Sequence, residues 1–260
     1  MLDQSVFEKF DLLPMSYSKL NSFSNYPCQF IINKLYKVDT GTNPAMRVGH
    51  LVEELLHLKL KKDELIEDEE FLIEMYKLKL KREFEDYHDQ ENLKKYISYI
   101  PKMYKQCDNF LKQLGNYQLL SYQEEISTSI LGINFIGYTD FLFDLDDELW
   151  LYDLKTKARM SKPSNSEYLQ QWIYKKALEE KYQKPVHCHL DIVTPTKRHC
   201  EELFFNDSHE IEIYNKIKGM ASLLQKCNTP EDVALLYQPN LDSWEWNAQN
   251  IPARKQIWGI

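Results

Sequence analysis

Apolar residues recur every three or four positions through the first part of the chain. The segments SYSKLNSFSNYPCQFIINKLYK and NPAMRVGHLVEELLHLKLKK show this spacing, which is typical of amphipathic helices. Ser16 or Ser18 is expected to cap the first helix, and Pro27 is expected to divide it. Similar spacing predicts two further helices at roughly 68–87 and 91–114.

After Gly115 the apolar period changes to about two, which is typical of strands. The segment YQEEISTSILGINFIGYTDFLFDLDDELWLYDLKT predicts three successive strands in a meander, with Gly132 and the acidic cluster DLDDE as the turns. SNSEYLQQWIYKKALEEKYQ predicts a helix capped by Ser164 or Ser166, and PVHCHLDIVTP predicts a short strand. This strand–helix–strand connection would place the last strand beside the meander by a crossover.

These elements predict an α/β fold in a single domain, 1–260. We expect a mixed central sheet of about four or five strands with helices on both sides, and an N-terminal helical layer. The predicted parts are a mainly helical layer (1–115), a sheet core that carries the chemistry (116–206), and C-terminal helices with an irregular tail (207–260).

Acidic residues in the second and third predicted strands are the first candidates for chemistry. If Asp146 and Asp147 form a two-residue turn, Asp140 lies directly opposite Asp153, and Lys155 shares their face. Like charges placed so are destabilising, and one lysine cannot neutralise two desolvated carboxylates. A hard divalent cation accepts oxygen ligands from both, so the pattern predicts a Mg²⁺ or Mn²⁺ site with a lysine beside it.

Other interpretations of this hairpin remain open at the sequence level. Asp153 and Lys155 could form a solvent-facing ion pair, and a three-residue turn would shift the register and separate the faces. The cluster DLDDE could also suggest a calcium loop, but it lacks the twelve-residue spacing of an EF-hand. A solvated turn is the better interpretation of that cluster.

Charge and composition narrow the class of protein. The formal net charge of −8 argues against a generally basic surface, but residues 151–200 hold ten Lys and Arg against five acids. The N-terminus has acids where a signal peptide is basic, and no apolar run reaches the ~18 residues of a membrane span. Five scattered cysteines suggest free thiols in a reducing compartment, so we expect a cytoplasmic protein with no membrane partner.

Several short motifs, taken in their order along the chain, resemble the PD-(D/E)XK nuclease superfamily. The resemblance is to its RecB-like exonuclease branch, which includes CRISPR adaptation nucleases and phage exonucleases. GYTDFLF resembles the G-x-x-D motif, LYDLKTK the D-x-K-T motif and LQQWIYKKA the Q-x-x-x-Y motif of this branch. SYSKLNSFSNYPCQFIINKLY is similar to its S-x-S-x-L opening.

The resemblance implies a restriction-endonuclease-like core and a catalytic set. Asp140, Asp153, Lys155 and Gln170 would be the catalytic residues. The implied ligands of Mg²⁺ or Mn²⁺ are Asp140, Asp153, the main-chain carbonyl of Leu154, and a side chain from the N-terminal helix.

Two departures from the branch affect its metal ligands. The branch carries G-x-x-x-H on this helix, whereas Gly49 is followed four residues later by Glu53. Glu53 is therefore the expected third ligand, as in related phage-type exonucleases, and His50 is the alternative ligand. Glu53 could instead be an exposed glutamate of the helix with no role in metal binding. Cys28 matches the N-terminal cysteine of iron–sulfur members, but the C-terminal cysteines are too far apart, which disfavours a cluster.

Candidate DNA contacts follow the D-x-K-T motif and continue on the helix after it. They are Thr156, Lys157, Arg159, Tyr174 and Lys175, with Lys162 and Lys176 as further basic positions. His187 and His189 flank Cys188 on a strand and so face away from it, and we assign no zinc there. Tail tryptophans, namely Trp244, Trp246 and Trp258, could stack on bases but are expected to dock on the domain.

The predicted function is a divalent-metal-dependent DNA exonuclease acting in recombination, repair or phage genome processing. Its partners would be DNA with free ends or single-stranded DNA and a recombination or replication protein, in a bacterial or phage-infected cell. Two alternatives remain: a catalytically silent DNA-binding or scaffold subunit with a nuclease-like fold, and a structure-selective endonuclease.

Overall fold

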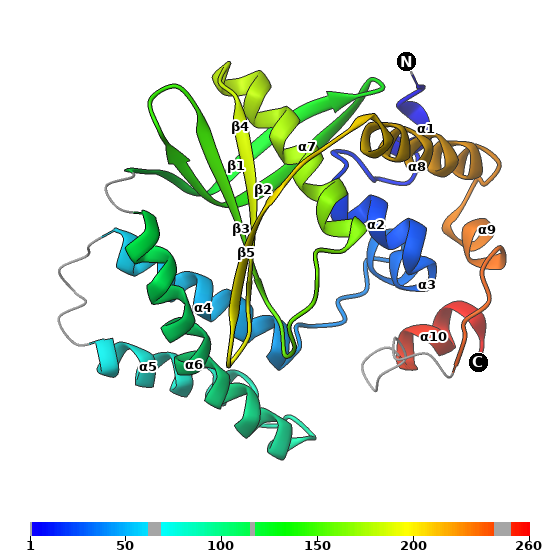
Figure 1. Ribbon diagram of the computed structural model, residues 1–260. Coiled ribbons are helices and arrows are strands. Elements are labelled where there is room, and N and C mark those ends of the chain that lie inside the picture. Colours follow the sequence, from blue (N-terminus) through cyan, green and yellow to red (C-terminus); the bar gives the residue numbers. More distant parts are fainter. Residues whose placement is uncertain (1, 62–68, 115–117, 242–250) are drawn as a thin grey trace.

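A five-stranded mixed sheet forms the centre of the protein (Figure 1). The computed structural model describes residues 2–61, 69–114, 118–241 and 251–260. The strand order β1-β2-β3-β4-β5 follows the sequence order. The strands are β1 (Gln118–Ile130), β2 (Ile133–Asp144), β3 (Leu149–Thr156), β4 (Val186–Val193) and β5 (Arg198–Leu203).

The pairing of the strands matches the predicted topology. β1, β2 and β3 form an antiparallel meander, and β3 and β4 are parallel and joined by helix α7 (Asn165–Tyr182). The α/β prediction, the three-stranded meander and the crossover are therefore confirmed. β5, antiparallel to β4, had no prediction of its own, because RHCEEL at this edge of the sheet lacks a clear apolar alternation.

The N-terminal helices begin and end where local sequence signals place them. Ser16 caps α2 (Tyr17–Asn25) by accepting a hydrogen bond from Lys19 N, and Pro27 starts α3 (Pro27–Phe30). Of the two predicted caps, Ser16 is the one used. The other N-terminal elements are α1 (Ser5–Glu8), a π-helical turn (Ile31–Leu35), α4 (Pro44–Leu60), α5 (Glu69–Glu83) and α6 (Gln90–Leu114).

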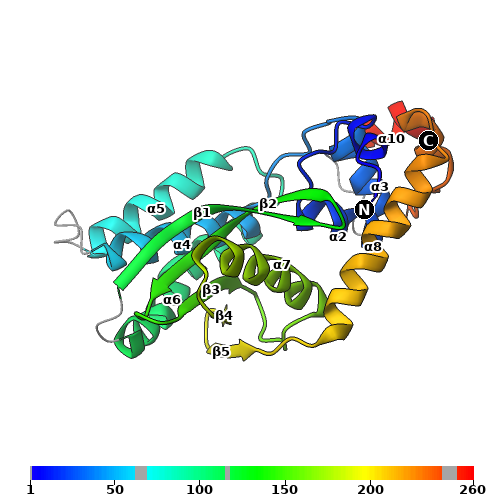
Figure 2. The same cartoon turned by 90° about the horizontal axis from the view of Figure 1, so that it is seen from above.

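The sheet separates two hydrophobic cores. Leu149 and Leu151 of β3 pack in the core shared with α2, α7 and α8 (Asp207–Gln225), whereas Tyr152 and Leu154 pack in the core shared with α4 and α6. This alternation is that of a strand buried on both faces. Figure 2 shows α4, α5 and α6 grouped at the opposite end of the molecule from α2 and α8.

The C-terminal region after the sheet is helical, as predicted from Asp207 onward. After α8 the chain forms α9 (Pro230–Leu235) and α10 (Ile251–Trp258). Trp258 donates hydrogen bonds from Nε1 to the carbonyl oxygens of Ala234 and Tyr237, each at 3.1 Å. Docking is therefore confirmed for Trp258, while Trp244 and Trp246 lie outside the described residues. None of the described helices is long and apolar enough to cross a membrane.

Strands β2 and β3 separate after a short ladder. Leu145 N donates to Glu148 O at 3.0 Å, so the predicted two-residue turn is present, and the ladder extends from Asp144–Leu149 to Phe141–Tyr152. Beyond it, β2 pairs instead with Met15, which exchanges hydrogen bonds with Asn134 O (2.9 Å) and Ile136 N (2.7 Å). The paired ladder thus ends one residue before Asp140 and Asp153, and a fork opens at these two positions.

Candidate active site

Asp140 lies at the fork and links the two separated strands through its side chain. Its Oδ2 accepts a hydrogen bond from Leu154 N at 2.7 Å. Burial raises the pKa of Asp140 well above its usual value, and the negative charges of Asp153 and Glu53 raise it further. Lys155 and the Leu154 N–H lower the pKa of Asp140 but do not cancel these effects. Asp140 is therefore part of a site with excess negative charge.

Asp153 and Lys155 form a close ion pair in the same site. Asp153 is 2% exposed, and its Oδ2 lies 2.6 Å from Lys155 Nζ. This buried carboxylate oxygen therefore has the Lys155 ammonium group as its partner. Burial disfavours the charged lysine, but Asp153 and Asp140 together raise the pKa of Lys155 above its usual value. The structure thus brings together the three residues that the hairpin predicted.

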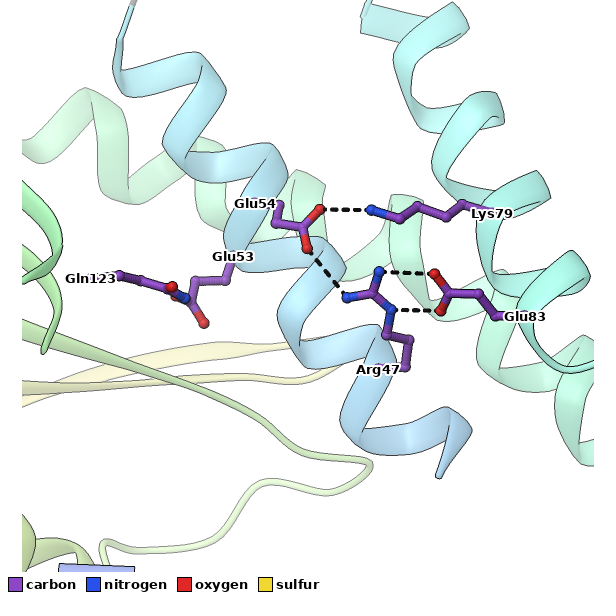
Figure 3. A network of polar contacts seen from close by, with 6 residues as sticks. All are labelled: Arg47, Glu53, Glu54, Lys79, Glu83 and Gln123. Carbon is purple, nitrogen blue, oxygen red and sulfur yellow. Dashed lines mark hydrogen bonds and ion pairs between the residues drawn. The ribbon is translucent and has the colours of Figure 1, made fainter. Parts of the chain in front are cut away.

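Glu53 reaches this region from helix α4 and is not an exposed helix glutamate. It is 8% exposed, and its Oε1 accepts a hydrogen bond from Gln123 Nε2 at 3.1 Å (Figure 3). Burial raises the pKa of Glu53, while hydrogen bonds from Gln123 and Tyr122 and the nearby His50 oppose the rise. His50, the alternative candidate, lies one turn earlier and is exposed.

Helix α4 approaches the end of β3 closely because residue 49 is glycine. A Cβ at Gly49 would lie 2.7 Å from Thr156 Oγ1, a distance that real Cβ atoms do not show. Thr156, predicted as a DNA contact, is thus packed against α4. The helix is also fixed on its outer side: Arg47 binds Glu83 of α5 through Nε (2.6 Å) and a second nitrogen (2.9 Å), as Figure 3 shows.

Helix α7 closes the other side of the fork. Its Ser164–Glu167 capping box fixes the N-terminus, and Gln170 Nε2 donates to Tyr174 Oη at 3.0 Å. Burial raises the pKa of Tyr174, and so does the charge of Asp153. A Cβ at Gly137 would lie 2.5 Å from Tyr174 Cε1, so only glycine allows this tyrosine to pack on β2.

The basic residues predicted as DNA contacts differ in how they are placed. Lys157 is paired with Glu167 Oε1 at 2.9 Å and donates to Ser161 Oγ at 3.0 Å. Lys175 lies at the junction of α7 and β4, where it binds Glu179 Oε1 (2.6 Å) and Val186 O (2.5 Å). The structure therefore does not bring Lys175 to the site. Arg159 and Lys162 are exposed on the loop between β3 and α7, and Lys176 pairs with Glu180.

The cysteines and the HCH segment are placed apart from this site. Cys188 packs in the α7-side core, whereas His189 stacks on Tyr152 on the opposite face of the sheet, as strand alternation predicted. His187 pairs with Glu202 at 2.8 Å and Glu148 at 3.3 Å. Cys28, Cys107, Cys188 and Cys227 are buried, and Cys200 is partly exposed.

The donor atoms at the fork fit a hard divalent cation. Within the described part of the chain, no three His, Cys, Asp or Glu side chains already stand as a metal-binding group. The fork nevertheless offers carboxylate and carbonyl oxygens, the ligands that Mg²⁺ and Mn²⁺ prefer. Asp153 Oδ2 is buried with one lysine as its partner, and the raised pKa of Asp140 marks a negative charge that this lysine does not compensate. Both features are accounted for by a cation ligated there.

Two site residues were not predicted from the sequence. Tyr122 and Gln123 of β1 face α4: the Tyr122 ring stacks on His57 with centroids 3.7 Å apart, and Gln123 binds Glu53. In the sequence they are an aromatic and a polar residue within an ordinary strand pattern. No local signal marks them, because their role depends on a helix some 70 residues earlier.

Comparison with known proteins gives a family match. The model of the PD-(D/E)XK nuclease superfamily matches residues 14–227. A protein named "putative exonuclease" from Eubacterium rectale has a similar structure, with 12% identity and a TM-score of 0.54 over 100% of this chain and 99% of that one. At this identity the similarity shows the fold alone.

The other comparisons add no argument. The structure of the protein SSO0001 aligns with 55% of this chain and 70% of its own, with 15% identity and a TM-score of 0.34. No curated protein matches the sequence.

Replacing Gly137 with alanine tests the packing of Tyr174 on β2. We expect Gly137→Ala to lower the free energy of unfolding by about 1–3 kcal/mol, because the tyrosine ring must move. Urea denaturation measures this. The matched control is Gly219→Ala in α8, where nothing lies within 4 Å and the helix should gain about 0.5–1 kcal/mol. Equal effects of the two substitutions would contradict the contact.

Replacing Asp140 with asparagine tests the charge excess at the fork. A carboxyl whose pKa is raised by folding destabilises the folded state increasingly as the pH rises above its unfolded value of about 3.9. In EDTA, Asp140→Asn should therefore be more stable than the wild type at pH 7, with a gain in Tm of a few degrees that shrinks toward pH 4.

Thermal unfolding followed by circular dichroism between pH 4 and 8 measures that gain. Asp147→Asn, at an exposed position of the hairpin turn, is the control and should show no such pH-dependent gain. A stability gain of Asp140→Asn that is constant across this range would show that charge repulsion is not its cause.

Proposed function

Since the chain belongs to the PD-(D/E)XK nuclease superfamily, we propose that it is a divalent-metal-dependent deoxyribonuclease that hydrolyses phosphodiester bonds at DNA ends. The observation that carries this proposal is the grouping of Asp140, Asp153 and Lys155 at the fork of the sheet. A structural role does not account for such a group, because two desolvated carboxylates beside one lysine destabilise the fold.

The metal would be held by oxygen atoms of four residues. These are the side chains of Asp140, Asp153 and Glu53 and the main-chain carbonyl of Leu154. When bound, Mg²⁺ or Mn²⁺ lowers the pKa of a water and stabilises negative charge on a phosphate group. Glu53 belongs to this set because it is buried beside the fork and its charge acts on Asp140.

Lys155 would act as a positively charged hydrogen-bond donor. Its raised pKa keeps the ammonium group protonated at neutral pH. An ammonium can donate both to an attacking water and to a phosphate oxygen, and its charge opposes the negative charge that develops in the reaction.

Gln170 and Tyr174 would position the reacting groups. Because Gln170 donates its amide to Tyr174 Oη, its side-chain carbonyl remains oriented and can accept a hydrogen bond from water or from Lys155. Arg159, exposed on the loop after β3, is the better-placed DNA contact of the predicted set, whereas Thr156 packs against α4. Lys157 would have to leave Glu167 before it could bind a phosphate.

The activity is tested with end-labelled linear DNA, single- and double-stranded, in Mg²⁺, Mn²⁺ or EDTA. We expect metal-dependent loss of DNA, abolished by Asp153→Ala and reduced about 10²–10³-fold by Lys155→Ala, because these remove a ligand and a charge-stabilising donor. Asp147→Ala in the exposed turn should keep full activity, and circular dichroism checks that each variant is folded.

Other outcomes identify the other functions. Cleavage of covalently closed circular DNA would show an endonuclease, since an exonuclease needs an end. DNA binding without cleavage in either metal would show a catalytically silent DNA-binding subunit. If Asp153→Ala keeps the activity of the wild type, the fork is not the active site.

A further inference from the structure

Strand β1 changes faces at one residue, Gln123. In a regular strand, residues 122 and 124 point to the same side of the sheet. Here Tyr122 stacks on His57 of α4, whereas Glu124 accepts a hydrogen bond from Tyr182 of α7 at 2.6 Å. The two helices cover opposite faces, so the side-chain direction inverts between these neighbours.

The inversion has a backbone cause. Gln123 has a φ of +50°, which lies in the left-handed region that residues other than glycine rarely adopt inside a strand. Pairing with β2 is kept on both sides of it, at Tyr122–Phe141 and Glu124–Thr139. The strained residue therefore stands opposite Asp140, at the fork itself.

The consequence of the inversion is a hydrogen bond to the buried carboxylate of Glu53. With regular alternation, Gln123 would point away from the side that Tyr122 occupies, and hence away from α4. The left-handed conformation instead lets Tyr122 and Gln123 both face α4, and Gln123 Nε2 donates to Glu53 Oε1 at 3.1 Å.

A neutral amide is suited to this position. It donates to the Glu53 carboxylate together with Tyr122, and the lone pairs that remain on the two oxygens can still ligate a cation. A neutral amide adds no positive charge that would compete with that cation. Glu54, the next residue, is held separately by Arg47 and Lys79, each at 3.2 Å, on the outer face of α4 (Figure 3). Neighbouring glutamates of one helix are thus fixed in opposite directions.

We propose that Gln123 is a positioning residue that sets the orientation of the Glu53 carboxylate for a divalent cation at the fork. The proposal rests on the proposed function only in taking Glu53 as a metal ligand. It goes beyond that function in assigning a role to a strained residue on β1, a strand that supplies none of the predicted ligands.

The test is direct Mn²⁺ binding to the full chain without DNA, measured by electron paramagnetic resonance. The variants are Gln123→Gly, Glu53→Ala and the control Glu125→Ala, whose side chain accepts from Tyr138 on the surface of the sheet. Glycine removes the amide but tolerates the positive φ, so relief of backbone strain offsets the lost hydrogen bond and Gln123→Gly should keep a Tm close to that of the wild type. Its Mn²⁺ affinity should fall about tenfold or more, as is usual for loss of a group that orients a ligand.

The outcomes separate this proposal from the proposed function. Loss of affinity in Gln123→Gly and Glu53→Ala, with an unchanged Tm for the former and normal binding by Glu125→Ala, supports it. If Glu53→Ala loses affinity and Gln123→Gly keeps it within twofold, the positioning role is overturned and the metal site stands. If Glu53→Ala binds Mn²⁺ like the wild type, or the wild type binds none, the role is overturned together with the ligand assignment.

Discussion

The separation of β2 from β3 beyond the Phe141–Tyr152 pair is the constraint on which the rest of the site depends. It leaves Asp140 and Asp153 at the mouth of a fork inside a sheet covered by helices on both faces. There the carboxylates are desolvated and share one ammonium group, that of Lys155. The neighbouring structure holds the fork open, since β2 continues with Met15 as its partner while β3 stays paired with β4. Electrostatic repulsion is therefore built into the fold at one place.

Two glycines allow helices from opposite faces to reach this place. Gly49 lets α4 contact Thr156 at the end of β3, which brings Glu53 toward the fork, and Gly137 lets Tyr174 of α7 pack on β2, which brings Gln170. The strands carry the charged groups Asp140, Asp153 and Lys155, and the helices hold further polar side chains beside them. Gln123 adds a third element, because its left-handed backbone turns β1 toward α4 just opposite Asp140. The site thus depends on contacts between segments that are far apart in sequence.

Local sequence signals predicted the parts of the fold that local physics determines. The Ser16 cap, the break at Pro27, the two-residue turn after Asp144 and the crossover through α7 all follow from nearby residues, and the structure has each of them. The grouping of Asp140, Asp153 and Lys155 followed from strand alternation and the turn. By contrast, the end of the ladder, the face change at Gln123, the pairing of Lys157 with Glu167 and the contact of Lys175 with Val186 O depend on tertiary packing. Charge counting along 151–200 could not distinguish paired lysines from exposed ones.

The excess of negative charge at the fork is the feature that we propose a divalent cation neutralises. The most direct measurement is the anomalous X-ray signal of Mn²⁺ in crystals of the protein grown or soaked with that ion. We expect a peak within coordination distance of Asp140, Asp153 and the Leu154 carbonyl, with a Glu53 oxygen as a further ligand. A fork without a peak, with Lys155 still paired to Asp153 while Mn²⁺ binds elsewhere, would contradict it.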